Sequence, residues 1–250
     1  MLEPKFRIAM AQSEHDIAAA QRLRYDVFVT ELGAGGSGVD HDLRIEEDAF
    51  DPFVDHMLLH DDANGRVVGV YRMMRPEQEA AMGRYYSDDE YNLTPLRQSG
   101  KRLLELGRSC LHAEYRGGTA MYHLWNGLAD YIAEQRIDLL FGVASFHGTD
   151  TMALAQPLSL LHYEHLAQAD VRPTARAPHA IGMDILPREA VDRRRAMLAV
   201  PALIKAYLRL GGKVGEGAFV DQAFNTTDVC LVMDTATINA RQAKLYQASR

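Results

Sequence analysis

Cysteine is almost absent from this sequence, with only Cys110 and Cys230 among 250 residues. Both lie in apolar runs, and two such thiols do not form the disulfide framework on which small secreted domains depend. With 47% hydrophobic residues, the chain can build an apolar core of ordinary size without covalent cross-links. We therefore expect both cysteines to be reduced core residues of a cytosolic protein.

Positive charge is also in deficit, because 27 Lys and Arg oppose 34 Asp and Glu and the formal net charge is −7. This balance disfavours general binding of nucleic acid. No apolar run approaches the roughly 20 residues of a membrane-spanning helix. The opening stretch MLEPKFRIAMAQSEHD lacks the apolar segment of a secretory signal. We expect a cytoplasmic protein, and whether it rests on the inner membrane stays open.

Apolar periodicity predicts alternating strands and helices. Ser13 stands in N-cap position before a helical pattern. Asn64-Gly65 lies between two apolar runs and predicts a β-hairpin. We expect further strands at 6–12, 101–112, 138–147 and twice within 213–234, and helices at 14–32, 117–137, 148–165 and 195–212. This order favours an α/β fold with a mixed sheet.

Charged residues recur beside these predicted elements. Arg24 and Phe28 share a helix face at i,i+4 spacing, although core packing and a surface ion pair also explain them. Asp48 and Asp51 belong to an acidic run that suits a cation or a basic substrate, or is a solvated loop. Arg72 ends an apolar strand, where a guanidinium needs an acidic partner. The acidic run upstream is the expected source of that partner.

Glu105 and Arg108 are the most informative pair. Residues three apart on a regular strand point to opposite faces, so the two reach one site only if the strand is bulged between them. Gly107 lies there, and glycine within a strand often marks a bulge beside an active site. Without the bulge, at most one of the two residues is in the site.

Other candidates are weaker. Ser145 and His147 end a strongly apolar strand, where α/β sheets often contact ligands, although core or capping roles also fit. Cys110 has no base beside it in sequence, which disfavours a nucleophilic thiol. We expect no metal site, because the two closely spaced histidine pairs, His56 with His60 and His162 with His165, lack a zinc-hydrolase pattern.

Taken in order, these motifs resemble a known family. Arg24-x-x-x-Phe28, Asp48-x-x-Asp51, Arg72 and Glu105-x-x-Arg108 resemble the acyl-homoserine-lactone synthases, which have a GNAT-like fold and take acyl chains from acyl carrier protein. Those synthases carry a tryptophan after the phenylalanine, where this sequence reads LGAGGS. The stretches RYDVFVTELGA, EEDAFDPFVDHMLL, ELGRSCLHAEYRGG, FGVASFHGTD and PALIKAYLRLGGKVGEGAFVDQAFNTTDVCLVM are more similar to the L-ornithine Nα-acyltransferases of ornithine-lipid synthesis.

The resemblance covers nearly the whole chain and implies a fold and an activity. The fold is a single GNAT-like domain over 1–250, with a mostly antiparallel central sheet flanked by helices and 190–250 as a C-terminal extension. The activity is transfer of a 3-hydroxyacyl chain from acyl carrier protein to the α-amine of L-ornithine, which gives lyso-ornithine lipid. A glutamine N-acyltransferase, a lactone synthase and a non-catalytic binder of acyl carrier protein remain alternatives.

The same resemblance implies roles for the candidates. Glu105 is the expected general base, directly or through water, and Arg108 orients it or holds a carboxylate. The other site residues shape the donor and amine pockets: Arg24, Phe28, Asp48, Asp51, Arg72, Ser145 and His147. Of these, Asp48 or Asp51 is expected to meet the side-chain ammonium of ornithine.

The donor is expected to be an acyl-phosphopantetheine delivered on acyl carrier protein, with no tightly bound cofactor. The turn Arg116-Gly117-Gly118 is out of register with the GNAT signature for coenzyme A, as such a donor would permit. The basic segment 193–213 is the expected dock for the acidic carrier, and it also suits an anionic membrane surface or a packed helix with solvated ends. A downstream O-acyltransferase is a further expected partner.

Overall fold

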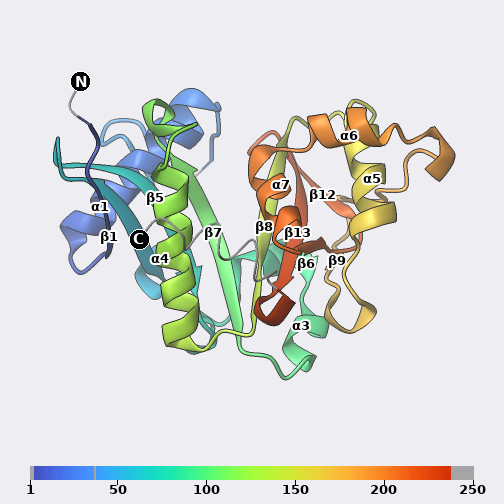
Figure 1. Ribbon diagram of the computed structural model, residues 1–250, viewed down its shortest axis with the longest axis horizontal. Helices are drawn as coiled ribbons and strands as arrows, with labels where there is room; N and C mark the ends of the chain where they lie inside the picture. Colours follow the sequence, from blue (N-terminus) through green and yellow to red (C-terminus); the bar gives the residue numbers. More distant parts are fainter. Residues whose placement is uncertain (1–2, 37, 238–250) are drawn as a thin grey trace. The chain divides into compact units, whose positions relative to one another are not determined.

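The computed structural model describes residues 3–36 and 38–237 of the chain. The described residues fall into two compact units, one of 3–83 with 106–136 and one of 84–105 with 137–237 (Figure 1). Both are mixed α/β units in which strands pair mainly antiparallel, which confirms the predicted fold class. The expected extension from residue 190 stays a prediction.

The first unit is built on the strand order β1-β4-β5-β7. Helix α1 packs on one face of these strands, where Leu23 joins Leu58 and Val70 in the core. Helix α4 covers the other face so closely that a Cβ at Gly127 would lie 2.8 Å from Ile8. The elements are β1 (Phe6–Met10), α1 (Glu14–Arg24), β2 (Val39–Asp40), β3 (Ile45–Glu46), β4 (Asp55–Asp61), β5 (Arg66–Met74), α2 (Pro76–Met82) and α4 (Ala120–Gln135).

Helix α1 begins as the sequence predicts. The Ser13 hydroxyl accepts from the backbone N–H of Asp16 at 3.2 Å, and the Asp16 carboxylate accepts in return from the Ser13 N–H. This reciprocal capping satisfies two amides that the first turn leaves without helical partners. The expected helix at 14–32 is not uniform, however, because it changes at Tyr25 to a π-helix, η1 (Tyr25–Glu31).

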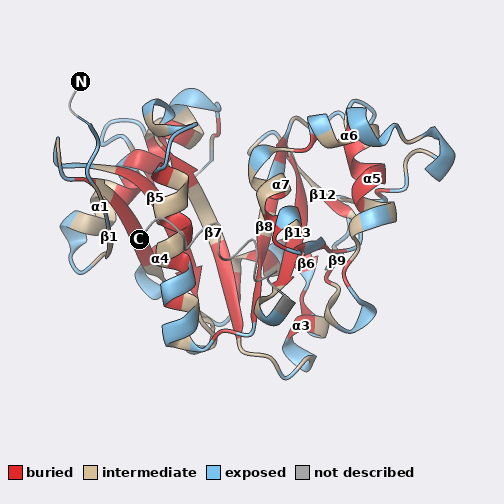
Figure 2. Cartoon of the chain, in the orientation of Figure 1, coloured by how far each residue is buried: buried red, intermediate tan, exposed pale blue. Residues whose placement is uncertain are grey.

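The second unit continues from the first part of β7 (Leu103–Leu111) in the order β7-β8-β13-β12-β10. Leu103–Glu105 pair in parallel with β8, and β8 and β13 pair antiparallel over their full lengths. These paired strands are largely buried (Figure 2). The elements are η3 (Tyr86–Asp89), β6 (Tyr91–Asn92), α3 (Thr94–Gln98), β8 (Leu139–His147), α5 (Ala155–His165), β9 (Thr174–Ala175), β10 (Ala180–Ile181), α6 (Arg193–Ala199), α7 (Ala202–Arg209), β11 (Lys213–Val214), β12 (Ala218–Asp221) and β13 (Thr226–Asp234).

The single helix expected at 195–212 is wrong. The chain forms α6 and α7 instead, and Val200 between them is extended at ψ 133°. Pro201 explains the break, because proline disfavours helical conformation in the preceding residue and cannot donate a backbone hydrogen bond. Among the described helices, none is both long enough and apolar enough to cross a membrane.

Candidate active site

Arg24 is the centre of a buried ionic network in the first unit. Its side chain is 1% exposed, at the end of α1. Nε donates to Glu46 Oε2 at 2.5 Å, and the two terminal nitrogens donate to the two oxygens of Asp51 at 2.7 and 2.8 Å. The Glu46 carbonyl accepts a further bond from Nη2. Burial of a guanidinium is tolerable only with such complete pairing.

Two more arginines complete this network. Arg72, on β5, donates through Nη1 to both oxygens of Asp48 at 2.6 and 2.7 Å and to Asp51 at 3.1 Å. Arg108, on β7, pairs with Glu46 at 3.0 Å and with Asp48 at 3.1 Å. We call the six side chains the ionic network: Arg24, Arg72, Arg108, Glu46, Asp48 and Asp51. Three positive and three negative charges therefore balance within it.

The network holds Asp48 and Asp51 in the ionised form. Burial alone would raise the pKa of Asp51, but hydrogen bonds and charge from Arg24, with the charge of Arg72, outweigh it and hold that pKa far below its usual range. The pKa of Asp48 is lowered in the same way, since the charges of Arg72 and Arg108 outweigh burial. At neutral pH these two carboxylates are anions, and their lowered pKa makes them weak proton acceptors in a reaction.

The irregularity expected in β7 is present, but at Arg108 itself. Its φ is +48°, in the left-handed region that residues with side chains seldom adopt. The two ion pairs to Glu46 and Asp48 hold the residue there. Gly107 is not required for space, since a Cβ at this position would lie 3.9 Å from Arg72 Nε, an ordinary van der Waals contact. The reversal at Arg108 therefore turns its guanidinium into the ionic network.

Glu105 lies in the second unit and is 4% exposed. Its two carboxylate oxygens accept from the backbone N–H groups of Tyr86 at 2.8 Å and Ser87 at 2.7 Å, in the first turn of η3. Two main-chain donors fix the position of the carboxylate more firmly than flexible side chains would. Glu105 is thus a buried, oriented acid, and its role as base stays a prediction.

The other predicted site residues have different surroundings. Phe28 is half-buried in η1 and packs against the core cluster that contains Leu23 and Leu58. Ser145 and His147 are exposed at the end of β8, where they pair with Asp228 and Thr226 of β13. The structure thus brings together Arg24, Arg72, Arg108, Asp48 and Asp51 in one network. Phe28 is absent from the network's hydrogen bonds and ion pairs described above.

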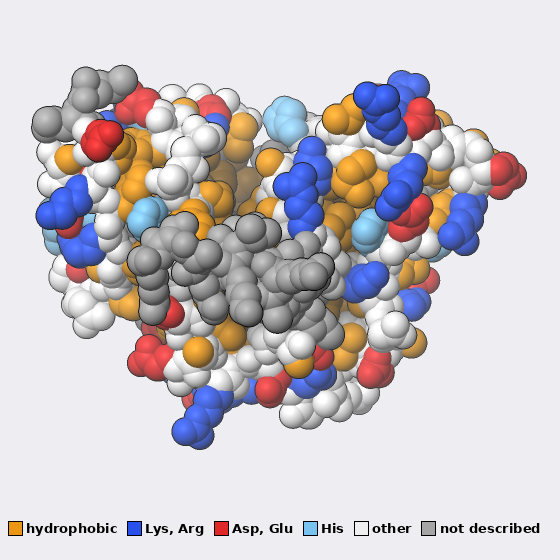
Figure 3. Space-filling view, viewed as in Figure 1, with side chains coloured by type: hydrophobic (Ala, Val, Ile, Leu, Met, Phe, Trp, Pro, Cys, Tyr) orange, Lys and Arg blue, Asp and Glu red, His pale blue; other side chains and the backbone are white. Residues whose placement is uncertain are grey.

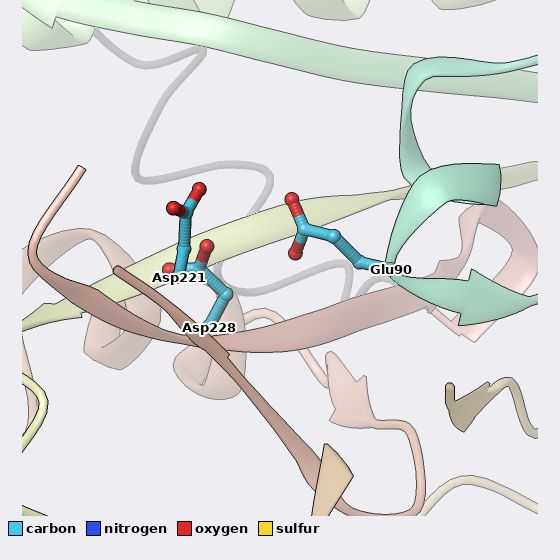
Figure 4. Close-up of side chains that lie close together, drawn as sticks. All are labelled: Glu90, Asp221 and Asp228. Carbon is cyan, nitrogen blue, oxygen red and sulfur yellow. The ribbon is translucent and has the colours of Figure 1, made fainter. Parts of the chain in front are cut away.

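Sequence reasoning missed two features. Glu46, 2% exposed, joins Arg24 to Arg108; its only sequence signal was membership of the acidic run. A second group of acids, Glu90, Asp221 and Asp228, lies in the second unit with ligand oxygens all within 4.8 Å of one another (Figure 4). Glu90 lies far from Asp221 and Asp228 in sequence, so no motif marks the group.

A thiol mechanism has little support. Burial raises the pKa of Cys110 to about 12 and that of Cys230 higher still. Since the thiolate is the nucleophilic form, neither cysteine is reactive at neutral pH. His56 does not bind a metal with His60, because its Nε2 lies 3.0 Å from the Asp51 carbonyl.

Comparison with known proteins places these features in a family. Residues 23–126, which include the whole ionic network, match the family described as the acetyltransferase (GNAT) domain. The chain is 55% identical over 246 residues to the L-ornithine Nα-acyltransferase of Rhodobacter capsulatus, with 96% of this chain and 94% of that protein covered. The chain belongs to the L-ornithine Nα-acyltransferase family.

Solved structures support the fold of this family member. An N-acyl amino acid synthase from uncultured soil microbes, FeeM, aligns with a TM-score of 0.55 at 12% identity, covering 99% of this chain and 100% of its own. The acyl-homoserine lactone synthase BjaI aligns with a TM-score of 0.53 at 14% identity, covering 98% and 89%. These likenesses confirm the predicted GNAT-like fold, shared with lactone synthases.

Proposed function

We propose that this chain transfers a 3-hydroxyacyl group from acyl carrier protein to the α-amine of L-ornithine, giving lyso-ornithine lipid. The observation that carries the proposal is the 55% identity to an L-ornithine Nα-acyltransferase over 96% of the chain. The oriented carboxylate of Glu105 supports this proposal, because it suits proton transfer from an amine.

The reaction replaces a C–S bond with a C–N bond. The ornithine α-amine attacks the thioester carbonyl, the tetrahedral intermediate collapses, and the phosphopantetheine thiolate leaves and takes up a proton. The α-ammonium must first lose a proton, which costs about 1–2 kcal/mol at pH 7 for a pKa near 8, against roughly 4.6 kcal/mol for a lysine-like side-chain ammonium. This difference favours acylation at the α-position.

Glu105 is proposed to accept that proton, directly or through one water. Its carboxylate is held in a fixed orientation by the backbone N–H groups of Tyr86 and Ser87. A general base of this kind contributes about 10²–10⁴-fold to rate. Asp48 and Asp51 are poorly suited to that task, because the arginines lower the pKa of both and so weaken them as bases.

The ionic network is proposed to act as a preorganised, rigid part of the first unit. Its six charges neutralise one another before substrate arrives, so little reorganisation is needed during the reaction. The same neutralisation argues against Asp48 or Asp51 as the partner of the ornithine side chain. An additional cation would have to displace an arginine from hydrogen bonds of 2.6–2.8 Å.

The donor carrier is proposed to dock on the basic surface around α6 and α7. Basic side chains gather over this part of the second unit (Figure 3), and Arg193, Arg194, Arg195, Arg209 and Lys213 are exposed. Leu198 is 72% exposed between them, so the surface offers an apolar contact as well as charge. Acidic carrier proteins are attracted to such a surface.

The product has one hydrophobic chain and a charged head, so it partitions to the inner leaflet, where an O-acyltransferase would act on its 3-hydroxyl.

The test is a reconstituted reaction of the purified chain with 3-hydroxyacyl carrier protein and L-ornithine. Mass spectrometry should find the Nα-acylated product and free carrier thiol in equal amounts. Glutamine, and S-adenosylmethionine in place of ornithine, serve as competing acceptors. A faster reaction with glutamine, or formation of an acyl-homoserine lactone, would contradict the proposal.

A further inference from the structure

Glu90, Asp221 and Asp228 form a three-carboxylate group that the mechanism above does not use. Glu90 directly follows η3, Asp221 ends β12 and Asp228 lies on β13, so the group is assembled from three separate segments (Figure 4). One oxygen from each lies within 4.8 Å of the others. Like charges this close repel, and the repulsion is strong where water is scarce.

Asp228 is the residue of this group whose carboxylate most needs a bound ligand. It is 4% exposed, and its Oδ1 has no hydrogen-bond partner among the described residues. Burial raises its pKa from 3.8 to about 6, although the neighbouring Ser145 hydroxyl opposes the shift. A buried carboxylate with an unused oxygen costs free energy unless a proton or another cation meets it.

The strand register places Asp228 on the same face of the sheet as Glu105. Glu105 pairs with Phe141 on β8, and Phe141 pairs with Val232 on β13. Side chains two residues apart share a face, so Ser145 and Asp228, which pair with each other, lie on that face too. Phe141 and Ser145 are four residues apart, or about 13 Å along the strand.

A second observation supports this common face. Cys230 lies between Val232 and Asp228 on it, and the charges of both Glu105 and Glu90, after the larger effect of burial, raise the pKa of its thiol. The proposed base and the three-carboxylate group therefore border the same buried region.

One short segment fixes both groups. The N–H groups of Tyr86 and Ser87, at the start of η3, bind Glu105. Glu90 directly follows η3, and its own N–H donates to the Ser87 carbonyl at 3.2 Å. Tyr91 follows and donates its hydroxyl to the Asp228 carbonyl at 2.9 Å. The distance between Glu105 and the acidic group is thus set by regular backbone contacts.

We propose that Glu90, Asp221 and Asp228 bind the side-chain ammonium of ornithine while its α-amine is held near Glu105. This assignment rests on the proposed function and names the group that would select ornithine. A primary ammonium has three N–H donors, one for each carboxylate. Glutamine would place a neutral amide there and leave the buried negative charge uncompensated.

An ammonium suits the group better than a metal ion does. Asp221 Oδ1 already accepts from the N–H groups of Ala223 at 2.8 Å and Phe224 at 3.1 Å. Those bonds leave this oxygen little capacity for metal coordination but do not prevent one further hydrogen bond at the carboxylate. Ser145, exposed beside Asp228, leaves the group open to solvent and hence to substrate.

The test compares ornithine with norvaline, which has the same carbon chain without the ammonium. Asp228→Asn and Glu90→Gln should each lower kcat/KM for ornithine by about 30-fold or more, the effect of removing one partner of a buried charge pair. Turnover of norvaline, slow in the parent protein, should be unchanged or faster, which also shows that the variants fold. Glu216→Gln, an exposed partner of Arg172, is the matched control and should change neither substrate.

The outcomes separate the inference from the proposed function. Ornithine acylation by the parent protein, with unchanged selectivity in both variants, would overturn the inference alone. Loss of activity with a chelator, restored by Mg²⁺, would assign the group to a metal and overturn it also. No acylation of ornithine by the parent protein would overturn the proposed function and the inference together.

Discussion

Arg108 and Glu46 form an ion pair of 3.0 Å although β7 and β3, which carry them, are far apart in sequence. The pair coexists with a φ of +48° at Arg108, a conformation that costs free energy for any residue with a side chain. Glu46 also accepts from Arg24, so one buried acid joins two arginines. The backbone distortion in β7 is thus maintained by charge pairing, and removal of Glu46 would leave two arginines under-compensated.

The ionic network should be a major source of stability in the first unit. Arg24→Met removes the guanidinium that Glu46 and Asp51 share and leaves each acid with one arginine instead of two. We therefore expect the free energy of unfolding to fall by about 3–5 kcal/mol. Urea denaturation measures it. Arg7→Met, which breaks the exposed pair with Asp62, is the control and should cost at most about 1 kcal/mol. Similar losses in the two variants would refute the network's structural importance.

Glu105→Gln tests the proposed base with little change in shape. We expect kcat to fall by about 10²–10⁴-fold, because the amide cannot accept the proton of the ornithine ammonium. KM for ornithine should change far less. Steady-state kinetics at pH 7 and 9 provide the check, since a higher pH supplies more free amine and should partly restore the variant. Retention of most activity at pH 7 would exclude Glu105 as base.

The pH dependence of ornithine binding follows from Asp228. Burial raises the pKa of Asp228 in the folded protein from 3.8 to about 6, so folding favours its protonated form. The stability that this residue contributes is therefore fully present below about pH 4 and is lost as pH rises through 6. The carboxylates of Glu90 and Asp221 and the Ser145 hydroxyl face it. Ornithine needs the ionised form, so KM for ornithine should fall as pH rises from 5 to 7.

Asp228→Asn should remove that pH dependence and raise the melting temperature of the ligand-free protein above pH 6, because a buried charge is lost. Thermal unfolding at pH 5 and 7.5, with and without ornithine, gives both quantities. A variant with the parent's pH profile would show that another group titrates.

The exposed basic side chains of α6 should control carrier binding. Arg194→Glu with Arg195→Glu should raise KM for acyl carrier protein at least about tenfold and leave KM for ornithine unchanged, because the substitutions affect encounter with an acidic partner. The difference should shrink at high salt. Arg7→Glu is the control in the first unit and should have no such effect. Equal KM values for the carrier in this variant and in the parent protein would show that the carrier docks elsewhere.

Local signals predicted most of the fold. Ser13 as a cap, the Asn64-Gly65 hairpin and the strands around Glu105 and Ser145 all depend on neighbours in sequence, and the structure confirms them. The π-helix from Tyr25 was not predicted, because apolar spacing cannot distinguish it from an α-helix over a few turns. The break at Pro201 was visible in the sequence, and the apolar run around it outweighed the proline in the prediction.

The candidate site was predictable only where function left a motif. Arg24, Asp48, Asp51, Arg72 and Arg108 were singled out by spacing and charge and then by resemblance, while their pairing required the fold. Asp228 is an isolated acid in an apolar strand and Glu90 is one of three successive acids, so neither has a sequence signature until its neighbours in space are known.

Expression of the chain in a bacterial host without aminolipids tests the central claim most directly. Lipid extracts analysed by mass spectrometry should contain lyso-ornithine lipid, and its fragmentation should show that the acyl chain is on the α-amine. The Glu105→Gln variant should yield little of this lipid. A lyso-glutamine lipid, or a homoserine lactone in the medium with no acylated ornithine, would contradict the account.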